Sequence, residues 1–297
     1  MKAIVFTTGT RDCEKLWRSF IMSFPGHEVR VMQYDVHGFD LGGIAEAEKP
    51  DVAIYIGAMA EFHNGCPVPS TDVLCRANRA TRMIHLCSDS ADPPWWPLLE
   101  QYNSAGAFRI QVGIDGCHDS PIARFGRVGL TPLHPDLFPD IGWVDRPHVC
   151  GFAGGSGIRQ QMLDYFKSLG LVWINEGGAV PYDQMCNFYT TCQMVLNDAR
   201  TGSTMRRHIK GRFIEAALAG AVPIESHDSP AKDWFTPGVD YHQWAGNYDI
   251  EERFARAGVD RANNEQMGMR LRAKMRKEHS APIFWRKVLA DIGYVAT

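Results

Sequence analysis

The sequence lacks the features that mark membrane, secreted and strongly charged proteins. No apolar run approaches the roughly 20 residues that a membrane-spanning helix requires. The apolar start KAIVF gives way directly to polar TTGTRD, so no secretory signal is expected. The net charge of -3 provides no global attraction for nucleic acid or anionic lipid. These absences predict a cytoplasmic protein with no membrane span.

Paired cysteines are missing as well. The eight cysteines include no CxxC pair, and several stand in apolar stretches such as MIHLC and HVCGF, which is typical of buried reduced thiols. The nearest approaches to metal-ligand spacing are His63 with Cys66 and Cys117 with His118, and neither fits a zinc site. We therefore expect no metal and no cofactor.

What the sequence does contain is a regular alternation of apolar strands and helical patterns. Its 297 residues, 45% of them hydrophobic, predict two domains of about 150 residues, with one large α/β barrel as the competing arrangement. Unbroken apolar strands between helices indicate parallel sheets covered on both faces. The expected strands are 2–6, 28–32, 51–56, 83–87 and 108–112 in the first half, and 148–153, 171–174, 193–196 and 221–224 in the second.

Four prolines between Thr131 and Pro147 indicate a linker between the domains. We therefore expect one domain over 1–140 and a second over 141–280. The remaining segment, 281–297, holds an expected helix, for which the N-terminal domain is the candidate packing partner.

The most informative stretch of the chain runs from Leu196 to Glu225. It is expected to form a strand end, a polar loop, an amphipathic helix that Gly220 ends, and a second apolar strand. Cations at the start of a helix meet the positive end of its dipole, so a bound anion would relieve their cost. The basic residues near this helix start are Arg200, Arg206, Arg207, His208, Lys210 and Arg212.

A glycine-rich turn follows the expected strand 148–153. Gly154, Gly155 and Gly157 precede a helix that starts near Ile158, and such a turn lets a diphosphate approach the helix N-terminus. Arg159 would lie in the first turn of that helix. The dinucleotide fingerprint is incomplete, because the third glycine is replaced by Gln160 and no acidic residue ends the next strand. A nicotinamide-dependent oxidoreductase is thereby disfavoured.

Two carboxylates, Asp89 and Asp92, follow the expected strand 83–87 in the run SDSADPPWW. One interpretation makes one of them a general base or a binder of an acceptor hydroxyl. The other makes them helix caps ahead of Pro93. His85 stands inside the apolar strand and is expected to be a core histidine with a satisfied partner.

The second half contains four further motifs: GFAGGSGIR, VLNDAR, RFIEAALAGAVP and WFTPGVDY. Together they resemble motifs of the two-domain GT-B glycosyltransferases, in the group 1 branch similar to spore-maturation glycosyltransferases. The resemblance implies an α/β fold of two Rossmann-like parallel-sheet domains facing a central cleft. The N-terminal domain would be the acceptor side, and 141–280 would bind a nucleotide sugar.

The resemblance also implies roles for individual residues. Glu215 would bind the ribose hydroxyls of the donor, Arg212 and Arg159 would stand near its diphosphate, and fixed cations would replace a metal. Many relatives carry a second glutamate eight positions before the ribose-binding one, but Arg207 stands there in this chain. Sugar contacts assigned to that glutamate are therefore not carried over.

The sequence thus predicts a metal-independent glycosyltransferase of the hexosyltransferase type. It would move a sugar from a nucleoside-diphosphate sugar, with UDP as the leading nucleotide, to an acceptor with a free hydroxyl. The acceptor would be a glycan or small molecule, or a hydroxymethylated pyrimidine in DNA, for which Arg76, Arg79 and Arg82 offer phosphate contacts. A non-catalytic nucleotide or sugar binder is the alternative.

The candidate catalytic residues are Asp89 and Asp92. The candidate donor-binding residues are Gly154, Gly155, Gly157, Arg159, Asn197, Arg200, Arg207, Lys210, Arg212 and Glu215.

Overall fold

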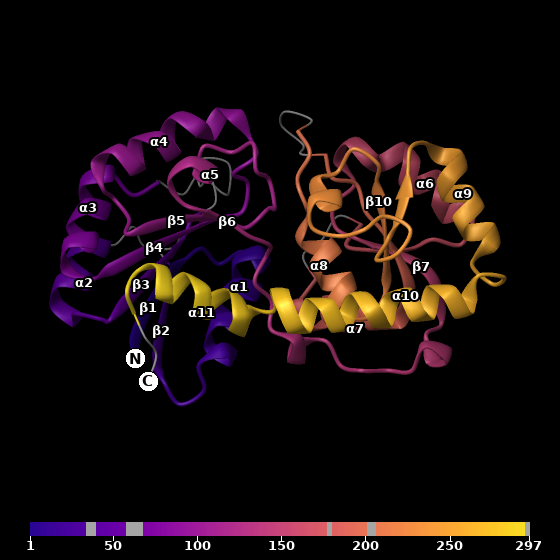
Figure 1. The fold of residues 1–297 in the computed structure, drawn as a ribbon, viewed down its shortest axis with the longest axis horizontal. Coiled ribbons are helices and arrows are strands. Elements are labelled where there is room, and N and C mark those ends of the chain that lie inside the picture. The colour runs from indigo at the N-terminus through magenta and orange to yellow at the C-terminus, as the bar shows by residue number, and fades with distance from the viewer. Residues whose placement is uncertain (34–39, 58–67, 177–179, 201–205, 295–297) are drawn as a thin grey trace. The chain divides into compact units, whose positions relative to one another are not determined.

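The structure, a computed structural model, describes residues 1–33, 40–57, 68–176, 180–200 and 206–294. The chain forms two compact units (Figure 1). Unit 1 comprises Met1–His134 together with Ala281–Thr297, and unit 2 comprises Pro135–Ser280. Each unit has its own parallel sheet and its own hydrophobic core.

The sheet of unit 1 has the strand order β2-β1-β3-β4-β5-β6, and every pairing is parallel. The sequence predicted the first five of these strands within about two residues, and it missed the sixth, which has only two residues. The strands are β1 (Lys2–Thr7), β2 (Glu28–Gln33), β3 (Val52–Ile56), β4 (Arg82–Cys87), β5 (Ile110–Gly113) and β6 (Arg127–Val128).

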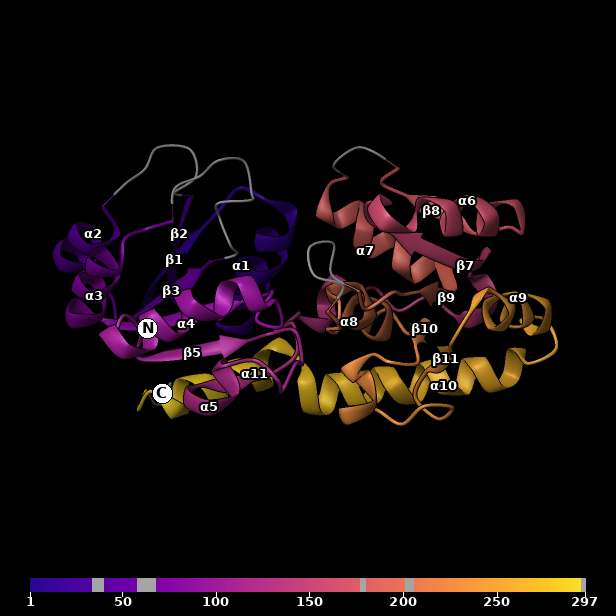
Figure 2. The same cartoon turned by 90° about the horizontal axis from the view of Figure 1, so that it is seen from above.

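Alternate side chains of these strands enter two separate hydrophobic clusters. Ala3 and Val5 face one cluster, whereas Ile4 and Phe6 face the other, as the two-residue period of a strand requires. The helices of the first cluster are α1 (Arg11–Ser23) and α11 (Ala281–Asp291). Those of the second are α2 (Leu41–Glu48), α3 (Thr71–Ala80) and α4 (Trp96–Ala105). Helices thus cover both faces of the sheet (Figure 2).

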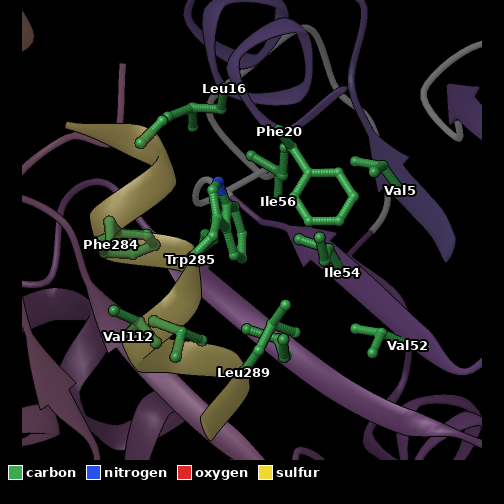
Figure 3. Close-up of a cluster of buried hydrophobic side chains, with 14 of the residues drawn as sticks. Val5, Leu16, Phe20, Val52, Ile54, Ile56, Val112, Phe284, Trp285 and Leu289 are labelled. Carbon is green, nitrogen blue, oxygen red and sulfur yellow. The ribbon is translucent and has the colours of Figure 1, made fainter. Parts of the chain in front are cut away.

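Helix α11 belongs to unit 1 although unit 2 precedes it in the chain. Its Trp285 is fully buried, and its ring lies 4.7 Å from that of Phe20 on α1 in an edge-to-face arrangement. Figure 3 shows Trp285 and Leu289 pointing from α11 toward Phe20 and Ile54. The last helix is therefore part of the core of unit 1.

The sheet of unit 2 has the order β11-β10-β9-β7-β8 and is also wholly parallel. Its strand β10 extends beyond the predicted end at Ile224, because Glu225 and Ser226 pair with Gln243 and Trp244 of β11. The strands are β7 (His148–Ala153), β8 (Val172–Ile174), β9 (Cys192–Leu196), β10 (Val222–Ser226) and β11 (His242–Trp244).

Helices cover both faces of this sheet too. Phe152 on β7 packs in a cluster with α6 and α9, while Gly151 faces α7, where the Phe188 ring occupies the space beside it. Helix α8 contacts α7, β9 and β10. The helices are α6 (Gln160–Ser168), α7 (Tyr182–Thr191), α8 (Gly211–Leu218), α9 (Asn247–Arg256) and α10 (Arg261–Lys274), which one π-helical turn over Met275–His279 continues.

The cysteines in the described ranges are all free thiols. Six are buried, Cys75 is half-buried, and Cys66 lies outside the described residues. Burial raises the pKa of the Cys192 thiol to about 12, so this thiol is protonated and unreactive at neutral pH. Within the same ranges, no helix is long and apolar enough to cross a bilayer.

Candidate functional site

The strand order of unit 2 creates a crevice at the carboxyl edge of its sheet. From β7 the chain continues to β8 on one side, whereas β9 and β10 lie on the other. Connections that leave neighbouring strands in opposite directions open such a crevice, and it is where parallel sheets bind their ligands. Gly154 follows β7 here, and Asn197 and Asp198 follow β9. The glycine turn and the polar loop therefore flank this switch point.

Gly154 allows the close approach of Arg212, which lies in the first turn of α8. The glycine has a φ of +129°, and a Cβ atom there would stand 2.8 Å from Nη2 of Arg212. Arg212 donates from Nε to the Ala153 carbonyl at 2.9 Å, and its Cζ lies 4.3 Å from the centroid of the Phe152 ring. Its buried Nη1 has no hydrogen-bond partner among the described residues. One edge of the guanidinium is thus fixed and another is available to a ligand.

A second arginine, Arg159, connects the glycine turn to the loop after β9. It ends the short 3-10 helix Gly157–Arg159, is 9% exposed, and donates from Nη2 to the Arg200 carbonyl at 2.6 Å. Its Nε lies 3.4 Å from Oδ2 of Asp198. Burial, followed by the neighbouring Arg212 cation, lowers the pKa of Arg159 to about 10, so the side chain stays charged at neutral pH.

Asp198 is the carboxylate at the centre of this cluster, and sequence reasoning missed it. It is fully buried and accepts from Nε of Arg200 at 2.9 and 2.8 Å and from the Arg200 backbone N–H at 3.0 Å. Burial opposes its ionisation, but these hydrogen bonds hold the pKa of Asp198 below its usual value. Asp198 is thus paired with Arg200 and lies beside Arg159.

A cavity of about 440 Å³ opens beside Asp198 and Arg200. Arg207 lines it and donates from Nε to Asp228 at 2.6 Å, while Met162 and Trp244 supply apolar wall. The other lining residues are Ile158, Gln161, Ser226, His227, Asp228, Ala245 and Asn247. Each of the two arginines in the lining is paired with an aspartate of the same lining, Arg200 with Asp198 and Arg207 with Asp228. The cavity therefore combines polar pairs with an apolar wall, as ligand pockets commonly do.

The structure brings six of the predicted donor-binding residues to this edge of the sheet. They are Gly154, Arg159, Asn197, Arg200, Arg207 and Arg212. Gly155 and Gly157 lie in the same turn with open space beside them. Helix α8 begins at Gly211, after an extended Lys210, so most of the basic residues precede the helix rather than lie in its first turn.

Glu215 takes a different position from these residues. It lies on α8, is 4% exposed, and accepts a hydrogen bond from the Tyr189 hydroxyl of α7 at 2.8 Å. Like Arg159 and Arg212, it is not among the residues that line the cavity beside Asp198. The role of this carboxylate at a ribose stays a prediction.

Glu225 is a second buried carboxylate that sequence reasoning missed. Its side chain is fully buried, and Oε1 accepts from the Ser226 N–H at 2.8 Å and from the Ser226 hydroxyl at 3.2 Å. Its Oε2 has no hydrogen-bond partner among the described residues. Burial raises the pKa of Glu225 to about 7. The available signal was a lone charged residue at the end of an apolar strand.

In unit 1, Asp89 and Asp92 lie in the turn after β4. The Asp92 N–H donates to the Asp89 carbonyl at 3.1 Å, and Asp92 stands just before the 3-10 helix Pro93–Trp95. Asp92 thus takes the N-cap position ahead of Pro93 that the cap interpretation gives it, but its side chain makes no capping hydrogen bond. The turn is held instead by Asp115, whose carboxylate accepts from Ser90 at 2.8 Å and from the Ala91 N–H at 2.9 Å.

No group of three histidine, cysteine, aspartate or glutamate residues in the described part of the chain is placed to hold a metal ion.

Residues 155–290 match the family described as glycosyl transferase-like. This segment is a glycosyltransferase family domain. The glycosyltransferase domain contains Arg159, Asp198 and Arg212, and it begins one residue after Gly154. No curated protein sequence matches the chain.

Solved structures extend the likeness to both units. Anabaena Alr3699/HepE in complex with UDP matches with a TM-score of 0.65 at 10% identity, over 99% of this chain and 100% of that chain. A sucrose-phosphate synthase from Thermosynechococcus elongatus gives 0.61 at 9% identity, over 99% and 98%. A glycosyltransferase from Rickettsia africae gives 0.59 at 10% identity, over 98% and 97%. The predicted fold class, α/β with the two parallel sheets of the GT-B fold, is confirmed.

Proposed function

We propose that this protein transfers a sugar from a UDP-sugar to an acceptor hydroxyl, and that unit 2 binds the donor at its switch point. The observation that carries the proposal is the pair of cations at the glycine turn, the buried Arg159 and the half-buried Arg212, whose Nη1 atom is itself buried. Alr3699/HepE has been solved with UDP, with UDP and glucose, and with UDP-glucose, which supports this donor class. The GFAGGSGIR motif supports a place in the branch similar to spore-maturation glycosyltransferases.

The diphosphate would lie against the turn at Gly154. Nη1 of Arg212 is already desolvated and unpaired, so a phosphate oxygen would satisfy it without breaking its bond to Ala153. Guanidinium groups pair well with phosphate oxygens, and these cations are fixed before the ligand arrives. As the bond to the sugar breaks, the leaving diphosphate gains charge, which fixed cations stabilise without a metal.

The remaining candidate residues would bind the other parts of the donor. Arg200 and Arg207 line the cavity, and the buried Oδ1 of Asn197 has no partner among the described residues. Lys210 precedes α8 at the same edge. Glu215 would accept the ribose hydroxyls beside its existing bond from Tyr189.

On the acceptor side, Asp89 or Asp92 of unit 1 would take the proton of the attacking hydroxyl. The proposed acceptor is a glycan or a small hydroxylated molecule, with hydroxymethylated DNA as a separate arm of the test. The free thiols support action in a reducing compartment such as the cytoplasm.

Calorimetric titration tests donor binding. We expect UDP and UDP-glucose to bind, and Arg212→Gln to weaken binding about tenfold or more because a charged hydrogen bond to phosphate is lost. Arg256→Gln is the matched control, since Arg256 pairs with Glu252 on the surface of α9. Absence of binding by both UDP and GDP would contradict the proposal.

Transfer assays separate an enzyme from a non-catalytic binder. Radiolabelled UDP-glucose is incubated with glycan, small-molecule and hydroxymethylated-DNA acceptors, with and without EDTA. We expect transfer that EDTA does not reduce, and that Asp89→Asn or Asp92→Asn lowers without weakening UDP binding. Binding with neither transfer nor hydrolysis would leave a binding protein, and loss of transfer in EDTA would refute metal independence.

A further inference from the structure

Glu225 is a buried carboxylate with only half of its hydrogen-bonding capacity used. Ser226 satisfies Oε1, whereas Oε2 has no partner among the described residues, and the side chain is inaccessible to solvent. Leaving such an oxygen unpaired is costly, more so when it is charged. A carboxylate kept in this state at the carboxyl edge of a sheet requires an explanation beyond packing.

The charged groups that interact with Glu225 belong to several elements of unit 2. Arg212 on α8 and Arg159 before α6 attract the charged form of Glu225, whereas Asp198 after β9 repels it. Tyr241, before β11, also interacts with it. Adjacent to it, the backbone N–H of Asn197 donates to the Ile224 carbonyl. Glu225 therefore interacts electrostatically with the same two cations that would hold the diphosphate.

Resting on the proposed function, we propose that Glu225 is a positioning residue of the donor site. It takes up a proton from solvent when the diphosphate binds, and it returns that proton when the diphosphate leaves. In the empty site, the charged carboxylate balances Arg212 and Arg159. In the occupied site, the phosphates supply that balance, and a neutral Glu225 avoids repulsion between two anions.

The sign of the pH dependence follows from this exchange. Without ligand, burial sets the pKa of Glu225 at about 7. A bound anion raises that pKa further, so the donor binds best when Glu225 is protonated. If the rise is about one unit, affinity falls about fivefold between roughly pH 6 and 8. If donor binding does not raise the pKa of Glu225, this residue makes no contribution to the pH dependence of donor affinity.

Proton uptake by the unmodified protein is the primary test. UDP-glucose is the probe, because its diphosphate has no proton to lose in this range. Titration calorimetry at pH 7 in buffers of different ionisation enthalpy measures the protons exchanged on binding. We expect uptake of a fraction of a proton per donor bound. Binding without uptake would overturn this inference and leave the proposed function intact, whereas no binding at all would overturn both.

Two variants identify the group that takes up the proton. Glu225→Gln keeps the shape of the side chain and should bind UDP-glucose with the same affinity at pH 6 and 8, near the wild-type value at pH 6. Glu252→Gln, on the surface of α9, should keep the fivefold fall. A fall that persists in Glu225→Gln would assign the proton to another group, such as His227 in the cavity wall, and would refute the role of Glu225. If Glu225→Gln does not fold, the measurement of proton uptake by the wild-type protein still tests the inference.

Discussion

Gly154 and Gly155 are neighbours in the turn after β7, yet a side chain would have different consequences at the two positions. At Gly154 the backbone has a φ of +129°, and a Cβ would collide with Arg212. At Gly155 no atom lies within 4 Å of the position that a Cβ would take, and the backbone is not in a left-handed conformation. The two glycines therefore form a matched pair for testing the turn.

We expect Gly154→Ala to lower the free energy of unfolding by about 1–3 kcal/mol, because it strains the backbone and displaces a guanidinium. It should also weaken UDP binding, whereas Gly155→Ala should change both quantities little. Urea unfolding and titration calorimetry measure the two effects. Equal behaviour of the two variants would show that the contact between Gly154 and Arg212 is unimportant.

His85 carries a second prediction at this scale. It is buried in β4, with Nδ1 3.0 Å from Oε1 of Gln111 and Nε2 3.4 Å from the Gly57 carbonyl, which confirms the expected core histidine. Burial lowers its pKa to about 4. Between pH 6.5 and 4 the unfolded chain would bind a proton at this residue that the folded chain does not, so stability falls as pH falls.

The pH dependence of unfolding measures this effect. We expect His85 to account for a loss of about 3 kcal/mol between roughly pH 7 and 4, with no further change below the folded pKa. The variant His85→Gln has no such proton, and its stability should depend less steeply on pH over this window. An unchanged slope in that variant would show that His85 is not the group responsible.

The candidate site also shows which residues sequence can locate. Glycines between a strand and a helix, and arginines crowded at a helix start, are local patterns, so Gly154 and Arg212 were found. Asp198 and Glu225 were missed, because their importance depends on neighbours from other elements. Glu225 is a strand residue only because it pairs with β11. The residue pattern of the strand itself does not predict that pairing.

Among the elements, α11 could be predicted as a helix from its own sequence, but its position in the fold could not. Its periodicity predicts a helix over 282–292, and the structure has Ala281–Asp291. Its place against α1 and the sheet of unit 1 depends on contacts across more than two hundred residues of sequence. Helix periodicity identifies the apolar face of a helix, but it does not predict which surface of the protein packs against that face.

We expect Trp285→Ala to destabilise unit 1 by about 3–5 kcal/mol, because a fully buried indole against Phe20 is replaced by a cavity. Lys287→Ala, on the exposed side of the same helix, is the control and should cost less than about 0.5 kcal/mol. Differential scanning calorimetry follows the transition of each unit. A loss confined to unit 2 would contradict the assignment of α11 to unit 1.

For the whole molecule, the donor residues and the acceptor candidates belong to different units. All of the proposed donor-binding residues lie in unit 2, and Asp89 and Asp92 lie in unit 1. Unit 2 has its own sheet and core, so the nucleotide contacts proposed for it do not require the core of unit 1.

We therefore expect the fragment 135–280 to fold alone and to bind UDP within about threefold of the full chain, but to transfer no sugar. Circular dichroism and calorimetry check folding and binding, and the labelled-donor assay checks transfer. A folded fragment that does not bind UDP would contradict the placement of the donor site.

The return of the chain to unit 1 also sets an order of events during synthesis. Unit 1 needs Phe284, Trp285 and Leu289 to complete the core beside Phe20, and these residues follow all of unit 2 in the chain. Domains fold as their residues emerge from the ribosome. Unit 2, the proposed nucleotide-binding unit, is therefore complete while the unit that begins the chain still exposes the apolar face that α11 covers. On the proposed function, a nascent chain would be able to bind its donor before the unit proposed to receive the acceptor is complete.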